Sequence, residues 1–172
     1  MELVKRLSDV KQDMVREWIR KTMEAYPTEA LSVFNRNKDK HANPLPHIIS
    51  KNIELLFDEL LIGISSEKTA PILAEIVRLK AVQDFTPSEA LKFVFELKPI
   101  IREYFKKESG EKDIINGLWV IEQEIDKLAG MAFDLYVNSR EKLFEIRANE
   151  IKNQTHMLIR RVNEMDKQKE AR

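Results

Sequence analysis

Residues 76–97, IVRLKAVQDFTPSEALKFVFEL, contain the clearest start of a helix in the chain. Thr86 is a preferred helix cap, Pro87 suits the first helical position, and the Glu89 carboxylate can accept a hydrogen bond from the backbone N–H of the cap. This capping box predicts that a helix begins at Pro87 and that the preceding helix ends by Asp84. The stretch is therefore expected to form a helix, a tight turn and a second helix.

The spacing of apolar residues extends both of these helices. The first is predicted to start near residues 68–69, because Pro71 then falls in the first turn, where a missing N–H breaks no helical bond. Its expected buried face consists of Leu73, Ile76, Val77 and Ala81. The second is predicted to kink at Pro99 and to close at residues 109–110.

The N-terminal part of the chain predicts two more helices and a loop. Residues 9–25 carry apolar side chains at spacings of three to five, with Ser8 as a cap, and residues 45–62 show spacings of three and four before Gly63. Between these helices, residues 35–46 are polar and contain two prolines, so we expect a surface loop there.

After about residue 113 the sequence predicts one long helix. Its apolar residues recur every seven positions, as in a coiled coil, at Val137, Phe144, Ile151, Leu158 and Met165. Polar Arg140, Arg147, Gln154 and Arg161 hold the second position of the repeat. We interpret this stripe as a surface for a second copy or for another protein; the alternative is that it packs on its own domain. The sequence thus predicts an all-α bundle with a long C-terminal helix.

Composition excludes several classes of function. The 172 residues contain 29 basic and 29 acidic side chains and no Cys, so neither a net positive field for nucleic acid nor thiol chemistry is expected. No apolar run reaches the length of a membrane span, and the N-terminus does not resemble a signal peptide. We therefore expect a cytoplasmic protein that binds neither nucleic acid nor membrane.

Candidate catalytic and metal-ligating groups are few. His41 and His47 flank the Asn-Pro-Leu-Pro segment in or beside the predicted loop, where the nearest candidate ligands, Asp39 and Asn43, are ordinary loop residues. His156 falls in the charged C-terminal helix. None is preceded by the Glu three residues earlier that a di-iron site in a bundle needs. Nucleophile elbows and phosphate loops are missing from the sequence as well. We predict no catalytic residues, no metal, no cofactor and no enzymatic activity.

Three polar residues on the helix before the capping box are the best candidates for a site. Arg78, Lys80 and Gln83 interrupt a helix that is otherwise ordinary, and their spacing can bring some of them to one face. In one interpretation they cap or bridge neighbouring helices, and in the other they line a ligand cavity.

The residues already named resemble a known family. Trp18 followed by Tyr26-Pro27, Asn43-Pro44 ahead of a helix, and above all the stretch 78–90 are similar to the N-terminal sensor domain of RsbT co-antagonist proteins, over roughly residues 10–140. The resemblance implies a globin-like fold without haem, a dimer, and a place at the sensory end of stressosome-type regulators. Only His47 lies close enough to a core helix to keep a haem-dependent alternative open.

The resemblance also gives the expected organisation. Residues 1–135 would form the globin-like sensor domain and residues 136–172 a coiled-coil-like helical extension. In the family a STAS domain follows, but the sequence ends at Arg172, so the phosphoacceptor sites of that domain correspond to no residue here. The predicted function is a non-enzymatic sensor that relays an unknown input through a dimeric C-terminal helix, with a structural adaptor as the alternative.

Overall fold

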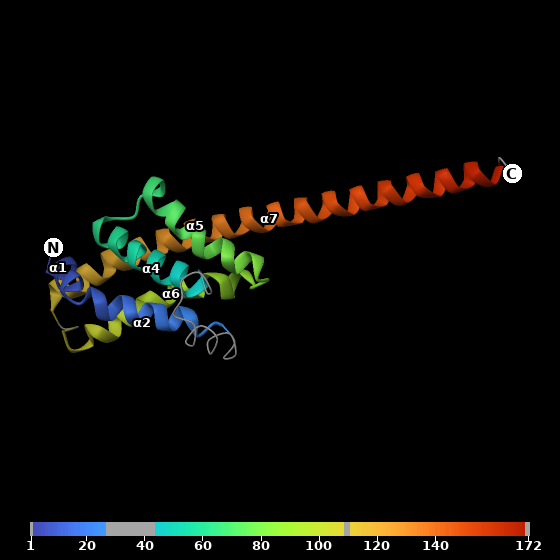
Figure 1. Cartoon of the computed structure of the whole chain (residues 1–172). Helices are drawn as coiled ribbons and strands as arrows, with labels where there is room; N and C mark the ends of the chain where they lie inside the picture. Colours follow the sequence, from blue (N-terminus) through green and yellow to red (C-terminus); the bar gives the residue numbers. More distant parts are fainter. Residues whose placement is uncertain (1, 27–43, 109–110, 171–172) are drawn as a thin grey trace. The chain divides into compact units, whose positions relative to one another are not determined.

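The computed structural model describes residues 2–26, 44–108 and 111–170. Within these ranges every regular element is a helix and none is a strand, which confirms the all-α prediction (Figure 1). The elements are α1 (Glu2–Asp9), α2 (Lys11–Met23), α4 (Pro44–Ile62), α5 (Ser66–Val82), α6 (Pro87–Tyr104), the 3₁₀ turn η1 (Lys106–Glu108) and α7 (Lys112–Glu170).

By its internal contacts the chain divides into two compact units, Met1–Tyr136 and Val137–Arg172. The helix α7 contributes its first turns to the first unit and its remaining turns to the second. We call residues 137–165, whose side chains are described, the tail helix. The assignment of a sensor function to one segment and an association function to the other stays a prediction.

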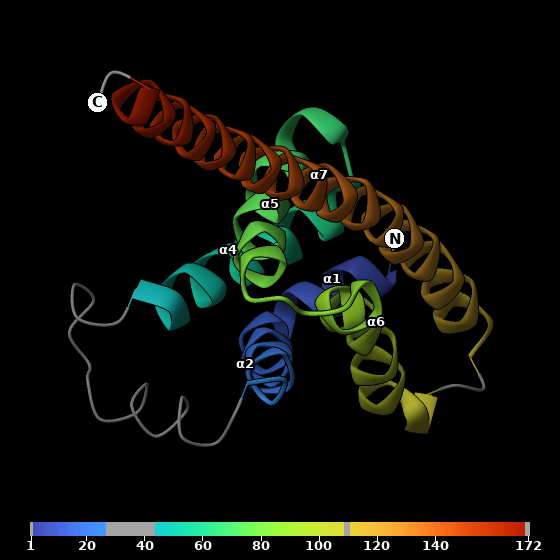
Figure 2. The ribbon, with the colours of Figure 1, turned by 90° about the vertical axis from the view of Figure 1, so that its right-hand side faces the viewer.

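The first unit is a bundle around one apolar core. Helix α2 packs against both α4 and α6, and α4 packs against α5 (Figure 2). Trp18, Phe57 and Leu97 have no exposed surface, and the first turns of α7 add Ile125 and Leu128 to the same core. The predicted face of α5 is confirmed, because Leu73, Ile76, Val77 and Ala81 are all buried.

The predicted capping box is present in full. The Thr86 hydroxyl accepts a hydrogen bond from the backbone N–H of Glu89 at 3.4 Å, and the Glu89 carboxylate accepts one from the backbone N–H of Thr86 at 2.9 Å. Helix α6 begins at Pro87, as predicted. The end of α4 is also as expected, because Gly63 adopts a φ of 117°, which favours a residue without a Cβ.

Some boundaries differ from the sequence prediction. Pro71 lies at the sixth position of α5 rather than in its first turn, because the helix already begins at Ser66 after an extended Ser65. Helix α4 begins at Pro44, so residues 44–46 are helical and not part of a loop. The rest of the predicted loop lies outside the described residues. Helix α6 ends at Tyr104 and the 3₁₀ turn η1 follows, so the predicted closure of this helix at residues 109–110 is wrong.

The N-terminus forms a helix that was not predicted. Ser8, the expected cap of α2, lies inside this helix α1, and Val10 takes the cap position of α2 without a side-chain hydrogen bond. Leu3 on α1 approaches α7 closely at Gly117, where an added Cβ would stand 2.6 Å from the Leu3 Cβ. Gly117 is therefore required for the close approach of these helices.

Candidate functional site

Lys80 is the most unusual residue of the first unit. It lies near the end of α5, is only 1% exposed, and its Nζ has no hydrogen-bond partner within the described part of the chain. Burial of an unpaired ammonium group is costly because the low-polarity interior does not replace its hydration. A residue kept in this state is a candidate for function rather than for stability.

Three aromatic rings surround the Lys80 ammonium group. Its Nζ lies 5.0 Å from the centroid of Tyr26, 4.6 Å from that of Phe85 and 5.9 Å from that of Phe93. The negative faces of the rings attract the cation and offset part of its lost hydration. Because the rings come from the end of α2, the α5–α6 turn and α6, this Lys80 cluster joins three elements.

The surroundings of Lys80 change its acidity. Burial lowers its pKa to about 8, and the nearby Glu89 carboxylate opposes this by favouring the charged form. Burial also raises the pKa of the Tyr26 phenol to about 12, so this group is neutral near pH 7. Lys80 is therefore the group of the cluster whose charge changes closest to neutral pH.

The turn after α5 connects the Lys80 cluster to the end of the first unit. Asp84 has a φ of 58°, which is unusual for a residue with a side chain, and the Phe85 N–H donates to the Lys80 carbonyl at 3.3 Å. The Tyr136 hydroxyl in turn donates to the Phe85 carbonyl. Since Tyr136 is the last residue of the first unit, the cluster is two contacts away from the start of the tail helix.

On its other side the cluster reaches Trp18. The Trp18 Nε1–H donates to the Phe93 carbonyl at 2.6 Å, and the two rings stack with their centroids 6.4 Å apart. The Thr22 hydroxyl then donates to the Trp18 carbonyl at 2.8 Å. Trp18 on α2 is thus joined to the Lys80 cluster through Phe93 on α6.

That surface contains a cleft of about 840 Å³, which we call the α2–α6 cleft. This volume is within the range of ligand-binding sites. Apolar side chains from both helices form much of its wall, and Phe95 and Tyr104 are each 48% exposed there. The charged residues that line it are Asp13, Glu17, Lys21, Lys92, Glu96 and Glu103.

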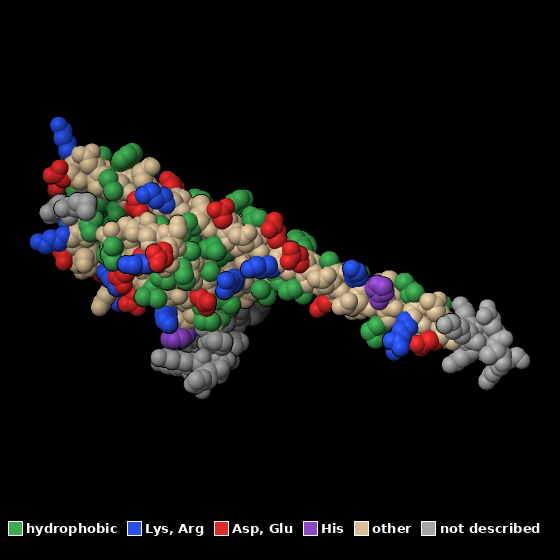
Figure 3. Space-filling model, turned by 90° about the horizontal axis from the view of Figure 1, so that it is seen from above, with side chains coloured by type: hydrophobic (Ala, Val, Ile, Leu, Met, Phe, Trp, Pro, Cys, Tyr) green, Lys and Arg blue, Asp and Glu red, His purple; other side chains and the backbone are tan. Residues whose placement is uncertain are grey.

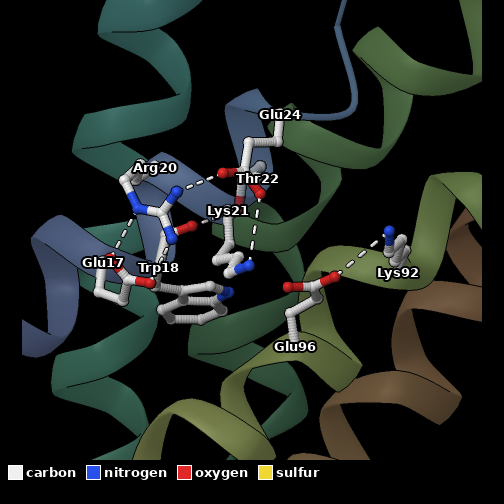
Figure 4. A network of polar contacts seen from close by, with 8 residues as sticks. All are labelled: Glu17, Trp18, Arg20, Lys21, Thr22, Glu24, Lys92 and Glu96. Carbon is white, nitrogen blue, oxygen red and sulfur yellow. Dashed lines mark hydrogen bonds and ion pairs between the residues drawn. The ribbon is translucent and has the colours of Figure 1, made fainter.

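The charges at the cleft are held by ion pairs, most of them within one helix (Figure 4). Glu17 accepts two hydrogen bonds from Arg20, at 2.8 Å and 2.6 Å, and this pairing lowers the pKa of the Glu17 carboxyl. The Lys92 and Glu96 pair is looser, with 3.4 Å between nitrogen and oxygen. Acidic groups outnumber basic groups in the cleft wall by four to two.

Residues 12–151 match the family described as RsbT co-antagonist protein rsbRD N-terminal domain. The chain belongs to this family. Searches among curated proteins and among solved structures found no match.

The rsbRD N-terminal domain family consists of regulatory domains that belong to stress-response signalling, so a regulatory role is established at this level. The family match confirms the resemblance seen in the sequence over most of its extent. The sensory input, the dimer and the absence of enzymatic activity go beyond what the family match establishes.

In this rsbRD N-terminal domain the three predicted site residues do not gather at one place. Lys80 is buried, whereas Arg78 and Gln83 are exposed. Arg78 lines a separate surface pocket together with Pro71 and Leu135. The Lys80 cluster replaces the expected trio, and its use as a ligand cavity stays a prediction.

The spacing of the buried residues of α5 is sufficient to predict that Lys80 is buried. This residue follows Leu73 by seven positions and Ile76 by four, so it falls on the buried face that these residues define. The aromatic partners and the α2–α6 cleft gave no comparable signal, because each depends on how separate helices pack.

The tail helix exposes the predicted stripe. Phe144 is 58% exposed, Ile151 64% and Leu158 61%, while Val137 is half-buried. Figure 3 shows apolar side chains interleaved with charged ones along this helix. Whether the stripe binds a second copy stays a prediction.

The remaining sequence candidates lie at the surface or outside the described residues. His47 is exposed in the first turn of α4, His156 is exposed on the tail helix, and His41 is not among the described residues. In the described ranges, no three His, Asp or Glu side chains cluster as metal ligands would. None of the described helices combines the length and the apolar content that crossing a membrane requires.

Proposed function

We propose that this rsbRD N-terminal domain is a non-enzymatic sensor that passes an input from its helical body to the tail helix. The tail helix associates with a second copy of the chain and presents the output to another regulatory protein. The family match supports a regulatory function, and the contacts around Lys80 support a route from the body to the tail helix.

The observation that carries this proposal is the short connection between Lys80 and Tyr136. The buried ammonium lies against the Phe85 ring, and the Phe85 carbonyl accepts the Tyr136 hydroxyl hydrogen bond. Because Val137 follows Tyr136 directly, a change in the turn that carries Phe85 acts on the first residue of the tail helix. An input at the cluster is thereby coupled to the output segment.

The Lys80 cluster has the properties of a two-state element. A buried charge without a hydrogen-bond partner among the described residues favours a second arrangement in which the ammonium reaches water or a partner. A ligand that favours one arrangement shifts the population by its difference in affinity for the two. Asp84, with its left-handed backbone, lies in the turn that such a rearrangement would move.

The tail helix supports the output half of the proposal. Phe144, Ile151 and Leu158 expose more than half of their surface at seven-residue intervals. Exposed apolar side chains repeated in this way are typical of a helix that buries them against another helix. Association of the tail helix is the readout that an input at the body would change.

The test combines thermal unfolding with sedimentation of the full chain. A panel of metabolites is screened for a rise in Tm, and each stabilising compound is then tested for a change in the association constant. If the protein is a sensor, at least one compound changes both the Tm and the association constant of the wild type. In Tyr136→Phe the same compound still raises Tm but no longer changes association.

An absence of any stabilising compound, with association constant throughout the panel, contradicts the sensor proposal. That outcome favours a structural adaptor, because an adaptor binds its complex without a small molecule. A compound that changes association equally in wild type and Tyr136→Phe contradicts the route through Tyr136.

A further inference from the structure

Arginines run through the middle of the apolar stripe of the tail helix. Arg140, Arg147 and Arg161 each follow a stripe residue by three positions, which is the second core position of a seven-residue repeat. Arg147 and Arg161 are exposed, and neither makes an ion pair among the described side chains. The Arg140 guanidinium lies 5.4 Å from the centroid of the Phe144 ring.

These arginines oppose the simplest form of pairing. In a parallel, in-register pair of helices, each core residue faces the same residue of the other copy. Arg140 would then face a second Arg140, and the same holds for Arg147 and Arg161. Like charges placed opposite each other reduce the stability of such a pair. The stripe therefore fits a surface that offers carboxylates beside apolar side chains.

The α2–α6 cleft offers this combination. Its wall contains the apolar Met14, Phe95 and Ile100 together with two more acidic than basic side chains. The Glu96 side chain is 21% exposed, and among the described residues it forms an ion pair with Lys92 alone, at 3.4 Å. The Glu96 carboxylate can exchange Lys92 for another cation at little cost, because exposed ion pairs of this kind contribute little stability.

The spacing of charges on α6 matches that on the tail helix. Glu96, Ile100 and Glu103 occupy positions 0, +4 and +7 on α6, and all three line the cleft. Arg140, Phe144 and Arg147 occupy the same positions on the tail helix. Seven residues rise by about 10.5 Å in any α-helix, so both ends of the two patterns can meet at once. In the reverse direction the two charged ends still match, but Phe144 then falls at +3, one position away from Ile100 at +4.

We propose that the α2–α6 cleft of one copy binds the tail helix of a second copy through Glu96, Ile100 and Glu103 against Arg140, Phe144 and Arg147. This inference rests on the proposed function, because it names the partner surface of the same tail helix. An output carried by the tail helix then reports directly on the helices that enclose Trp18 and the Lys80 cluster. The cleft is part of the regulatory device and not a passive surface.

The experiment is a charge exchange in the full chain, followed by sedimentation equilibrium. The cleft variant is Glu96→Arg with Glu103→Arg, and the tail variant is Arg140→Glu with Arg147→Glu. Each is expected to weaken self-association about tenfold or more, because two attractive contacts become repulsive. The chain that carries all four changes, or an equal mixture of the two variants, is expected to regain most of the wild-type association.

Matched controls separate these effects from changes in net charge or folding. Glu67→Arg with Glu75→Arg makes the same change in charge on α5, where both residues are exposed and form no ion pair among the described residues. This control is expected to associate as the wild type does. Circular dichroism and Tm identify a variant that fails to fold. Such a variant is replaced by its uncharged form, Glu96→Gln with Glu103→Gln or Arg140→Gln with Arg147→Gln, which is also expected to weaken self-association.

Two outcomes overturn the inference. If the tail variant changes association but the cleft variant does not, the tail helices pair with each other, and only the proposed function survives. If the wild-type chain is a monomer at every concentration reached, the tail helix binds a different protein and the second copy is excluded. A sensor response that requires Tyr136 is measured separately, so it can succeed or fail on its own.

Discussion

The body and the tail helix depart from the usual placement of side chains in opposite ways. In the body the cationic Lys80 is buried at 1% exposure, whereas in the tail helix the apolar Phe144 is 58% exposed. Apolar side chains normally lie inside and charges outside. The buried charge costs stability, whereas the exposed apolar side chain adds little to it, so neither placement is explained by the folding of the isolated chain alone.

Of the variants that test this difference between body and tail, Lys80→Met is expected to change stability most. Lys80→Met keeps the length of the side chain but removes the buried charge, so the free energy of unfolding at pH 7 should rise by up to about 3 kcal/mol. This value follows from a native pKa of about 8 against an ordinary value of 10.5. Urea unfolding at pH 7 measures the change, and Lys92→Met, at an exposed position, is the control.

The same variant tests the dependence on pH. Between pH 8 and pH 10.5 the unfolded chain keeps the Lys80 proton while the native chain loses it, so the contribution of Lys80 to stability rises with pH over this window and is constant below it. Lys80→Met should remove this rise. A loss of stability at pH 7 in Lys80→Met would show that the rings fully compensate the buried charge.

The second prediction concerns the close approach of α1 and α7. Gly117→Ala places a Cβ 2.6 Å from Leu3, so it should reduce the free energy of unfolding by about 1–3 kcal/mol. Gly130 lies on the same helix with nothing within 4 Å of an added Cβ. Gly130→Ala should therefore stabilise the chain by about 0.5–1 kcal/mol, and equal effects at the two glycines would contradict the packing of α1 on α7.

The third prediction concerns the cap of α6. Thr86→Ala removes the hydroxyl that accepts from the Glu89 N–H, and it should cost about 1 kcal/mol of unfolding free energy. Thr86→Ser keeps an accepting hydroxyl and should lose much less. Chemical denaturation of the three chains under one buffer condition gives the comparison.

The smallest effect on stability is expected in the tail helix. Phe144→Asp changes an exposed residue, so at low protein concentration the free energy of unfolding should change by less than about 0.5 kcal/mol. At high concentration the same variant should associate more weakly than the wild type. A large loss of stability in the dilute protein would mean that Phe144 packs within its own chain.

The sequence predicted the parts of the fold that depend on local chemistry. Thr86, Pro87 and Glu89 determine the start of α6 by contacts among four consecutive residues, and the spacing of Leu73, Ile76 and Val77 defines the buried face of α5. The prediction from Pro71 was wrong, because local preference places a proline in the first turn of a helix. In the folded chain, packing tolerates this proline inside α5. Tertiary contacts override propensity at such positions.

The candidate site could be predicted only in part for the same reason. The sequence indicates Lys80 as a candidate, but its partners Tyr26 and Phe93 lie 54 positions before it and 13 after it in the sequence. No local pattern joins residues that meet only when α2, α5 and α6 pack. The α2–α6 cleft likewise depends on the distance between two helices, and this distance cannot be predicted from the sequence of either helix alone.

The hydrogen bond from Trp18 to the Phe93 carbonyl has a practical consequence for optical spectroscopy. The chain has two tryptophans, of which Trp18 is fully buried beside the Lys80 cluster and Trp119 is 65% exposed. Replacing the exposed indole with phenylalanine would leave a single fluorophore inside the body. Its emission would then report the polarity around the buried cation in real time, without any added label.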